Sequence, residues 1–161
     1  TVNDNPKVYA DYALREKGYK IGFIASGDHN GIGVGSAVLL AKEKTRKGLL
    51  EALRARRCYA TTGDKIFLDF KVDDTLMGET ISRTKMPEIS INVKGTDSIK
   101  FVELLRNSRV VKTFEVPKGK DKFSVLYTDS AASEEAGVLY YYARITQEND
   151  HIAWSSPVWL E

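Results

Sequence analysis

The sequence has few of the residues that cross-link small folds or hold metal ions. Its 161 residues include one cysteine, Cys58, two histidines and four prolines. A single cysteine excludes an internal disulfide. A catalytic zinc site normally needs about three protein ligands, and the two histidines, His29 and His151, are far apart in the chain. A complete histidine-rich metal site within this chain is therefore excluded.

Long apolar runs and a dominant charge are missing as well. No run approaches the ~20 apolar residues of a membrane span, and no targeting pattern is present at the amino terminus. The net charge of +2 gives no overall electrostatic preference for nucleic acid or acidic membranes. We therefore expect neither as a partner, whereas the compartment stays open. A hydrophobic share of 42% and a charged share of 29% are typical of a globular chain.

Residues 1–63 combine helical and strand patterns. Thr45 is a candidate cap for the second of two expected helices, and Leu49, Leu50 and Leu53 are expected to face inward from it. The expected strand over 21–26 is apolar at nearly every position, as in strands that are covered on both faces. The predicted elements are a helix over 8–17, strands over 21–26 and 36–41, and a helix over 46–57.

Residues 64–161 change to alternation with a period of two. A hairpin is expected around residues 106–109, where Asn107 tolerates a positive φ. Tyr140 and Tyr142 are expected on one face of a strand and Tyr141 on the other. About seven short strands predict an antiparallel β-sandwich of immunoglobulin-like size, without the cysteine pair of that family. The expected strands cover 66–72, 89–93, 99–105, 110–116, 123–127, 138–146 and 154–160.

The change of pattern near residues 61–64 predicts two parts, 1–63 and 64–161, and an α+β fold class for the chain. The β part is large enough to bury a core by itself. The first part leaves strand edges unpaired and apolar faces uncovered, which is marginal for about 63 residues. The chain also begins with Thr1 and not with Met. Both observations favour a piece of a longer protein, although removal of an initial Met would look the same.

Asp28 and His29 are the candidate metal ligands of this sequence. They follow the predicted strand 21–26 and open a glycine-rich loop. Metallohydrolases of the α/β class place ligands in this way, at the carboxyl end of a parallel strand. From the residues alone, Asp28 is more typical of a turn, in which Asp is common. The loop glycines do not match a Walker phosphate loop, because no Gly-Lys-Ser/Thr follows.

Three segments carry a resemblance to a known family. Residues 22–31 (Gly-Phe-Ile-Ala-Ser-Gly-Asp-His-Asn-Gly) resemble the last metal motif of the PHP (polymerase and histidinol phosphatase) superfamily of metal-dependent hydrolases. Residues 48–64 resemble the segment that follows this motif in the CehA/McbA-like, carbaryl-hydrolase-like branch, and residues 153–159 resemble the end of the same proteins. The likeness extends over about residues 18–161.

The resemblance implies that residues 1–63 are the C-terminal tail of a (β/α) PHP-type barrel whose other ligands lie upstream. It implies divalent metals (Zn, Mn or Fe) in the parent protein, which activate water to hydrolyse a small phosphoester, ester or carbamate. Asp28 and His29 would be ligands from this stretch. Many PHP proteins have one residue between Asp and His. His29 would therefore be a metal ligand, a residue that contacts a metal ligand, or a residue that contacts the substrate. By itself this chain is expected to hold no metal tightly and to be inactive.

Two other functions compete with this one. The β-sandwich is alternatively a binding module for carbohydrate or protein, with Tyr140, Tyr141, Tyr142, Trp154 and Trp159 as a candidate sugar platform. The exposed α/β part is alternatively a self-association surface. Residues 42–57 hold seven basic and two acidic residues, a pattern that is more typical of an amphipathic helix with a solvated face than of a nucleic-acid site. Cys58 is expected to be buried, and His151 to be solvated in a turn.

Overall fold

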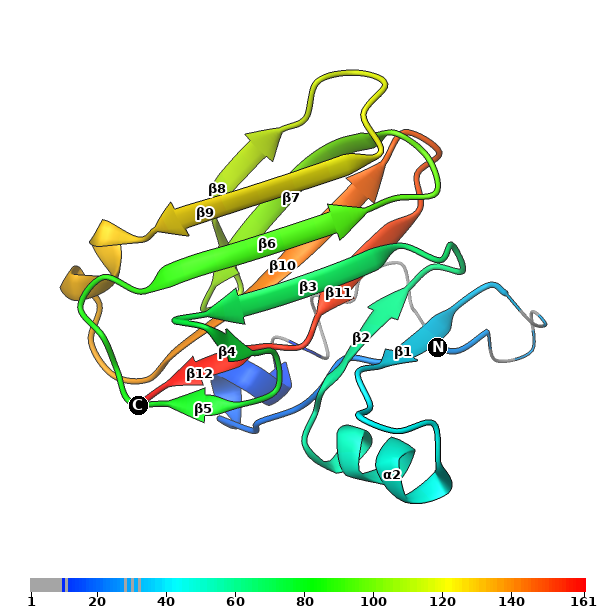
Figure 1. Cartoon of the computed structure of the whole chain (residues 1–161). Coiled ribbons are helices and arrows are strands. Elements are labelled where there is room, and N and C mark those ends of the chain that lie inside the picture. The colour runs from blue at the N-terminus through cyan, green and yellow to red at the C-terminus, as the bar shows by residue number, and fades with distance from the viewer. Residues whose placement is uncertain (1–9, 11, 28, 30, 32) are drawn as a thin grey trace.

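The computed structural model describes residues 10, 12–27, 29, 31 and 33–161 (Figure 1). One turn of π-helix spans Tyr12–Glu16, a 3₁₀ turn spans Ser130–Glu134, and the only longer helix of the described residues is α2 (Arg46–Arg54). The strands are β1 (Ser36–Leu39), β2 (Cys58–Thr61), β3 (Phe67–Val72), β4 (Thr75–Leu76), β5 (Thr80–Ile81), β6 (Glu88–Lys94), β7 (Ile99–Arg106), β8 (Arg109–Glu115), β9 (Lys122–Thr128), β10 (Leu139–Gln147), β11 (Ile152–Ser155) and β12 (Val158–Leu160).

The strands form two sheets that pack face to face. One sheet has the order β1-β2-β11-β10-β12-β5, with β7 pairing with β10 and β8 with β7, and the other has the order β4-β3-β6-β9. The pairs are antiparallel apart from β12 with β5. The β-sandwich predicted for residues 64–161 is therefore confirmed, and mostly antiparallel sheet dominates the described chain (Figure 1).

The main core lies between the two sheets and follows the alternation seen in the sequence. In β10, Tyr141, Ala143 and Ile145 are fully buried on this side, opposite Phe70 of β3 and Ile91 of β6. Because side chains alternate across a strand, the intervening residues of β10 face away from this core. The strand nevertheless has almost no exposed position, which means that its other face is covered too.

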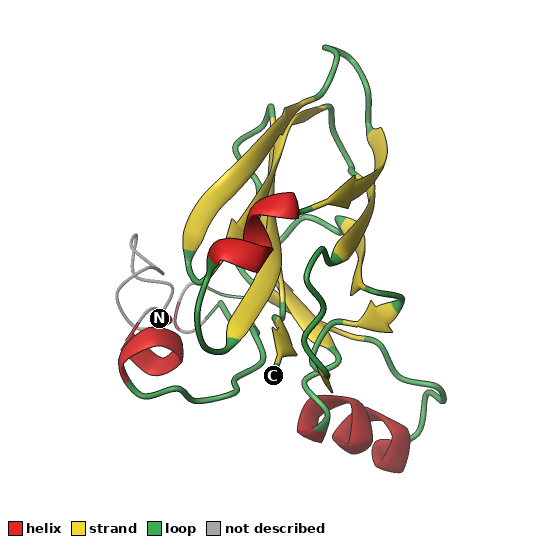
Figure 2. Ribbon diagram, turned by 90° about the vertical axis from the view of Figure 1, so that its left-hand side faces the viewer, coloured by secondary structure: helices red, strands yellow, loops and turns green. Residues whose placement is uncertain are grey.

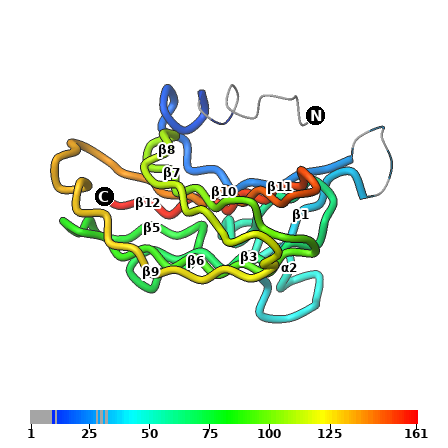
Figure 3. The backbone as a smooth tube through the Cα atoms, turned by 90° about the horizontal axis from the view of Figure 1, so that it is seen from above, coloured from blue at the N-terminus to red at the C-terminus, as the bar shows by residue number. Residues whose placement is uncertain are grey.

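The amino-terminal segment covers that other face. Figure 3 shows it on the side of β10 and β12 that lies away from β3, β6 and β9. Leu14, Ile21 and Phe23 pack there in a second apolar cluster with Leu105, Tyr140, Tyr142 and Trp159. The rings of Phe23 and Tyr142 meet edge to face, with centroids 5.3 Å apart. The predicted separation of Tyr140 and Tyr142 from Tyr141 is confirmed.

The strand predicted over 21–26 does not form in this structure. Instead of joining a strand ladder, Phe23 donates its backbone N–H to Ser156 Oγ at 2.8 Å, and Ile24 is 59% exposed. A Cβ atom added at Gly22 would lie 3.0 Å from Cys58 Sγ, so glycine permits a close approach to β2. The apolar run thus reflects packing on a finished sheet. Of the helix predicted over 8–17, one turn is present at Tyr12–Glu16, and residues 8, 9 and 11 lie outside the described residues.

The helix predicted over 46–57 is present as α2, but its leucines do not face inward. Thr45 caps the helix as expected, since its Oγ1 accepts a hydrogen bond from the N–H of Gly48 at 3.1 Å. Leu49, Leu50 and Leu53 are 37%, 42% and 40% exposed, whereas Ala52 is fully buried. The prediction assumed that the apolar side of the helix would meet the sheet. The side of the helix that is buried is instead the one that carries Ala52.

The sheet continues across residue 63, where the sequence pattern changes. Strand β2 pairs with β11, with Thr61 opposite Ala153, and β1 pairs with β2. The predicted division into residues 1–63 and 64–161 does not coincide with a break in the sheet. The division itself, and the assignment of residues 1–63 to a barrel, stay predictions.

A polar cluster joins the end of β2 to the turn between β10 and β11. Asp64 accepts hydrogen bonds from Thr96 Oγ1 at 2.6 Å and from Gln147 Nε2 and Asn149 Nδ2 at 2.9 Å each. His151, expected to be solvated, has its Nδ1 3.0 Å from Thr62 Oγ1 and its Nε2 3.6 Å from Asp64. The hydrogen bonds, that from Thr96 above all, lower the pKa of the Asp64 carboxyl below its usual range.

This lowered pKa predicts an acid-sensitive contribution to stability. A carboxylate whose pKa is lower in the folded state than in the unfolded state stabilises the fold. This contribution is complete at pH values above the unfolded pKa of about 3.9, and it is lost as the pH falls from there through the folded pKa. Because Asp64 is partly exposed, we expect less than about 1 kcal/mol. Urea unfolding of the chain and of Asp64→Asn at pH 7 and pH 3 measures it. The difference between the two proteins should shrink at pH 3, and an unchanged difference would contradict the assignment.

Candidate functional site

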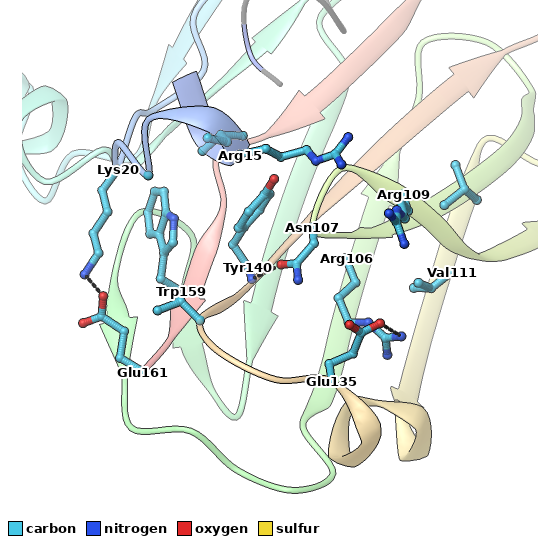
Figure 4. Close-up of a pocket in the computed structure, with 14 residues that line it drawn as sticks. Arg15, Lys20, Arg106, Asn107, Arg109, Val111, Glu135, Tyr140, Trp159 and Glu161 are labelled. Carbon is cyan, nitrogen blue, oxygen red and sulfur yellow. Dashed lines mark hydrogen bonds and ion pairs between the residues drawn. The ribbon is translucent and has the colours of Figure 1, made fainter. Parts of the chain in front are cut away.

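A cleft of about 640 Å³ opens on the outer face of the eight-stranded sheet (Figure 4). One wall is the amino-terminal segment with its helical turn, and the opposite wall is the hairpin of β7 and β8. The carboxyl-terminal strand β12 and the start of β10 lie between them. The cleft is lined by Leu14, Arg15, Gly18, Lys20, Arg106, Asn107, Arg109, Val110, Val111, Glu135, Val138, Tyr140, Trp159 and Glu161.

The floor of the cleft is aromatic and rigidly held. Tyr140 and Trp159 lie next to each other in Figure 4 and pair across β10 and β12. The Tyr140 hydroxyl lies 2.9 Å from Ser108 Oγ, and its backbone N–H donates to Asn107 Oδ1 at 3.0 Å. Both rings are almost fully buried, at 6% and 3% exposed. They therefore form a firm base, and the open sugar platform considered for these aromatics is not present on this face.

Some of the basic side chains on the cleft walls have an acidic partner and others do not. Lys20 pairs with Glu161 at 2.7 Å, and Arg106 pairs with Glu135 at 3.0 Å. Within the described part of the chain, the side chains of Arg15 and Arg109 make no ion pair or hydrogen bond, and both residues are exposed. Figure 4 shows the Arg15 side chain extending from the helical turn towards the hairpin that carries Arg109. The excess positive charge of the cleft thus belongs to two arginines on opposite walls.

The hairpin places its arginines by a tight turn. Asn107 and Ser108 have φ values of 50° and 61°, which is the geometry of a two-residue turn with both central residues left-handed. Arg106 and Arg109 are therefore paired directly across β7 and β8. The hairpin predicted around residues 106–109 is confirmed. Both residues line the cleft. Arg106, which pairs with Tyr141 of β10, turns its guanidinium to Asp129 and Glu135.

A buried polar network anchors this wall from beneath. Arg106 Nη1 donates to Asp129 Oδ2 at 2.5 Å, and the hydroxyl of Tyr141 donates to the same oxygen at 3.0 Å. Asp129 is 2% exposed and Tyr141 is fully buried. Burial, followed by the nearby Asp129 charge, raises the pKa of the Tyr141 hydroxyl well above its usual range. Tyr141 therefore stays protonated and acts as a hydrogen-bond donor at all physiological pH values.

Of the two predicted metal ligands, only His29 belongs to the described residues, and it is not part of the cleft lining. Asp28 lies outside the described residues, and His29 is exposed in the loop that precedes β1. Gly31 and Gly33 of the same loop have φ values of 90° and 98°. Among residues 10, 12–27, 29, 31 and 33–161, no three His, Cys, Asp or Glu side chains gather as a metal site would require. The described residues do not by themselves fit a catalytic metal.

Cys58 is 2% exposed, as expected. Burial is the main cause that raises the pKa of its thiol above the usual value, so the thiol is poorly suited to nucleophilic chemistry. In the part of the chain that the structure describes, neither the helical turns nor α2 has the length and apolar character needed to cross a membrane.

Two of the cleft residues, Tyr140 and Trp159, were among the candidate sugar-platform residues, whereas the charged residues of the walls were not predicted as a site. Arg106 and Arg109 were recognised as flanking a turn, but Arg15 and Lys20 lie about 90 residues away in the sequence. Nothing in the local pattern shows that the amino-terminal segment crosses the outer face of the sheet. The usable signal was Tyr140 and Tyr142, because apolar residues on the second face of a strand indicate that something covers it.

No known family model matches the chain. It is 32% identical to an uncharacterized protein of Chlamydia trachomatis and to one of Chlamydia muridarum, over 99% of this chain and 30% of each relative's length. A third uncharacterized protein, from Chlamydia pneumoniae, is 33% identical over 91% of this chain and 28% of its own length. The chain therefore spans less than a third of the length of the relatives it matches.

Among solved structures, the chain is similar to the CARDB domain of the PF1109 protein from Pyrococcus furiosus, which was crystallised in complex with di-metal ions. The two chains are 18% identical with a TM-score of 0.38, over 61% of this chain and 96% of that one. A TM-score of this size is too low to assign them to one fold.

Proposed function

We propose that this chain is a β-sandwich binding module and that its cleft holds an acidic carbohydrate. The observation that carries the proposal is the pair of uncompensated arginines, Arg15 and Arg109, on opposite walls of a 640 Å³ cleft. Guanidinium groups bind carboxylates through paired, charge-assisted hydrogen bonds. An anion between the two walls would relieve the repulsion of the two like charges.

The shape and lining of the cleft favour a small polar ligand over a protein partner. Its volume lies within the range of small-molecule sites, about 300–1,000 Å³, and protein partners more often bind flat surfaces with exposed aromatic anchors. Asn107 and Glu135 add hydrogen-bonding groups suited to hydroxyls. The buried rings of Tyr140 and Trp159 hold the floor fixed, so the polar groups above it need not be ordered when a ligand binds.

The test compares two disaccharides that differ by one carboxylate. Isothermal titration calorimetry of the chain with cellobiouronate should show binding at least roughly tenfold tighter than with cellobiose, because one hydrogen-bonded charge is worth about 1.5–3 kcal/mol. The double variant Arg15→Ala/Arg109→Ala should remove this preference, whereas Lys118→Ala, an exposed charge outside the cleft, should keep it. Equal affinity for both sugars, or no binding of either, would contradict the proposal.

A second candidate function is that of the C-terminal part of a PHP-type metallohydrolase. It is favoured by the resemblance of residues 22–31 and 48–64 and by relatives that have more than two thirds of their length outside the match. In this proposal Asp28 and His29 supply ligands to divalent metals held mainly by an upstream barrel, and the parent hydrolyses a small phosphoester, ester or carbamate. The sandwich would then be an accessory domain of that enzyme.

The test of the second function uses the whole open reading frame that encodes this chain. We expect its product to contain divalent metal and to hydrolyse bis(p-nitrophenyl) phosphate or carbaryl. Asp28→Ala should lose this activity, whereas His151→Ala, whose imidazole lies in the polar cluster of the sandwich, should retain it. Hydrolysis that is insensitive to Asp28→Ala, or absent from a metal-loaded product, would contradict this function.

A further inference from the structure

The apolar side of α2 is a feature of the described surface that the fold does not explain. Three leucines, Leu49, Leu50 and Leu53, share one side of the helix and are 37–42% exposed. Figures 1 and 2 show α2 projecting from the body of the sandwich and attached at its two ends. Scattered exposed leucines are ordinary, but three on one side of a nine-residue helix form a contiguous apolar patch.

Such a stripe is normally the side by which a helix packs. Isolated helices shorter than about 12–15 residues are marginal in water, and most of their stability in proteins comes from burial of an amphipathic face. In this chain α2 buries only Ala52. The three leucines, whose burial would stabilise the helix most, are each more than a third exposed.

The surroundings of the stripe are basic. Lys42, Lys44, Arg46, Lys47 and Arg54 are all exposed around it. Arg57 is neutralised by Glu51 at 2.8 Å. An apolar centre with a charged rim is the usual anatomy of a protein interface. A matching partner would have an apolar patch with acidic residues around it.

We propose that the leucine side of α2 packs against another domain of a longer polypeptide, through an apolar patch with an acidic rim. Two independent observations support this occupant. The first is the charge just described, which repels a second copy of the same basic surface. The second is that the relatives match 91–99% of this chain yet have 70–72% of their length outside the match. The inference goes beyond carbohydrate binding in the cleft, whose lining does not include α2.

The experiment measures the accessibility of single cysteines to a maleimide. Leu50→Cys reports on the α2 surface, and Leu126→Cys, 65% exposed on β9, is the matched control. The native thiol of Cys58 adds little background, because it is 2% exposed and burial raises its pKa. Each variant is made in the 161-residue chain and in the product of the whole open reading frame.

We expect Leu50→Cys to react at least roughly tenfold more slowly in the longer product than in the 161-residue chain, and Leu126→Cys to react at similar rates in both. Equal rates for Leu50→Cys would overturn the proposal, as would an open reading frame that encodes no further domain. The proposal would also be overturned if Leu50→Cys already reacted slowly in the 161-residue chain and its labelling rate fell further as the protein concentration was raised. That result would assign the surface to self-association.

Discussion

Replacing Asp129 with alanine is expected to destabilise the sandwich by about 3–5 kcal/mol, since removal of one partner leaves a buried charge uncompensated. Asp129 is 2% exposed and accepts hydrogen bonds from both Arg106 and Tyr141. Its loss leaves the 9%-exposed Arg106 without its buried partner and the Tyr141 hydroxyl without an acceptor. Urea unfolding followed by tryptophan fluorescence measures the change.

Glu135→Ala is the matched control for this prediction. Glu135 pairs with the same arginine, at 3.0 Å, but its side chain is 42% exposed. Exposed ion pairs are worth about 0–1 kcal/mol, so the control should change stability little. Replacing both Arg106 and Asp129 by leucine should cost less than Asp129→Ala alone. Equal losses for Asp129→Ala and Glu135→Ala would show that the buried network does not anchor the hairpin.

Phe70→Ala is expected to cost about 3–5 kcal/mol, through the lost burial of the ring and the cavity left between the two sheets. Phe70 is fully buried in the centre of β3, opposite Ile91 of β6. The same strand offers its own control, because Phe67 is 53% exposed. Phe67→Ala should change the free energy of unfolding by less than about 0.5 kcal/mol. Similar values for the two variants would contradict the assignment of the core.

The sandwich could be predicted because its strands alternate with a clear period of two. In β3 and β6 the apolar residues that share one face of the strand are fully or almost fully buried, and Asn107 correctly indicated the turn between β7 and β8. These signals are local: a strand or turn fixes its own geometry within a few residues. The pairing of β2 with β11 was not predicted, since it joins residues about 90 positions apart.

The failures have a common physical origin. Periodicity shows which side of an element is apolar, but not what covers that side. Leu49, Leu50 and Leu53 were expected to face inward because such a stripe usually packs, and in this chain they stay 37–42% exposed. The apolar run 21–26 was expected to be a strand covered on both faces, and it lies instead across the outer face of the sheet, with Ile21 and Phe23 in the second cluster.

The same limit applies to the candidate sites. Asp28 and His29 were predicted as metal ligands because adjacent ligand-type residues after an apolar run are a recognisable pattern. The cleft has no such pattern, because Arg15 and Arg109 are brought to the same cleft only by the path of the amino-terminal segment. Sites assembled from distant surface residues need the topology before they can be predicted.

An NMR titration tests the proposed binding function most directly. With the ¹⁵N-labelled 161-residue chain, we predict that cellobiouronate shifts the amide signals of residues 14–20 and 107–111, on the two walls of the cleft, and that cellobiose shifts them much less. Shifts confined to the outer face of β3, β6 and β9, or no shifts at millimolar sugar, would contradict the account.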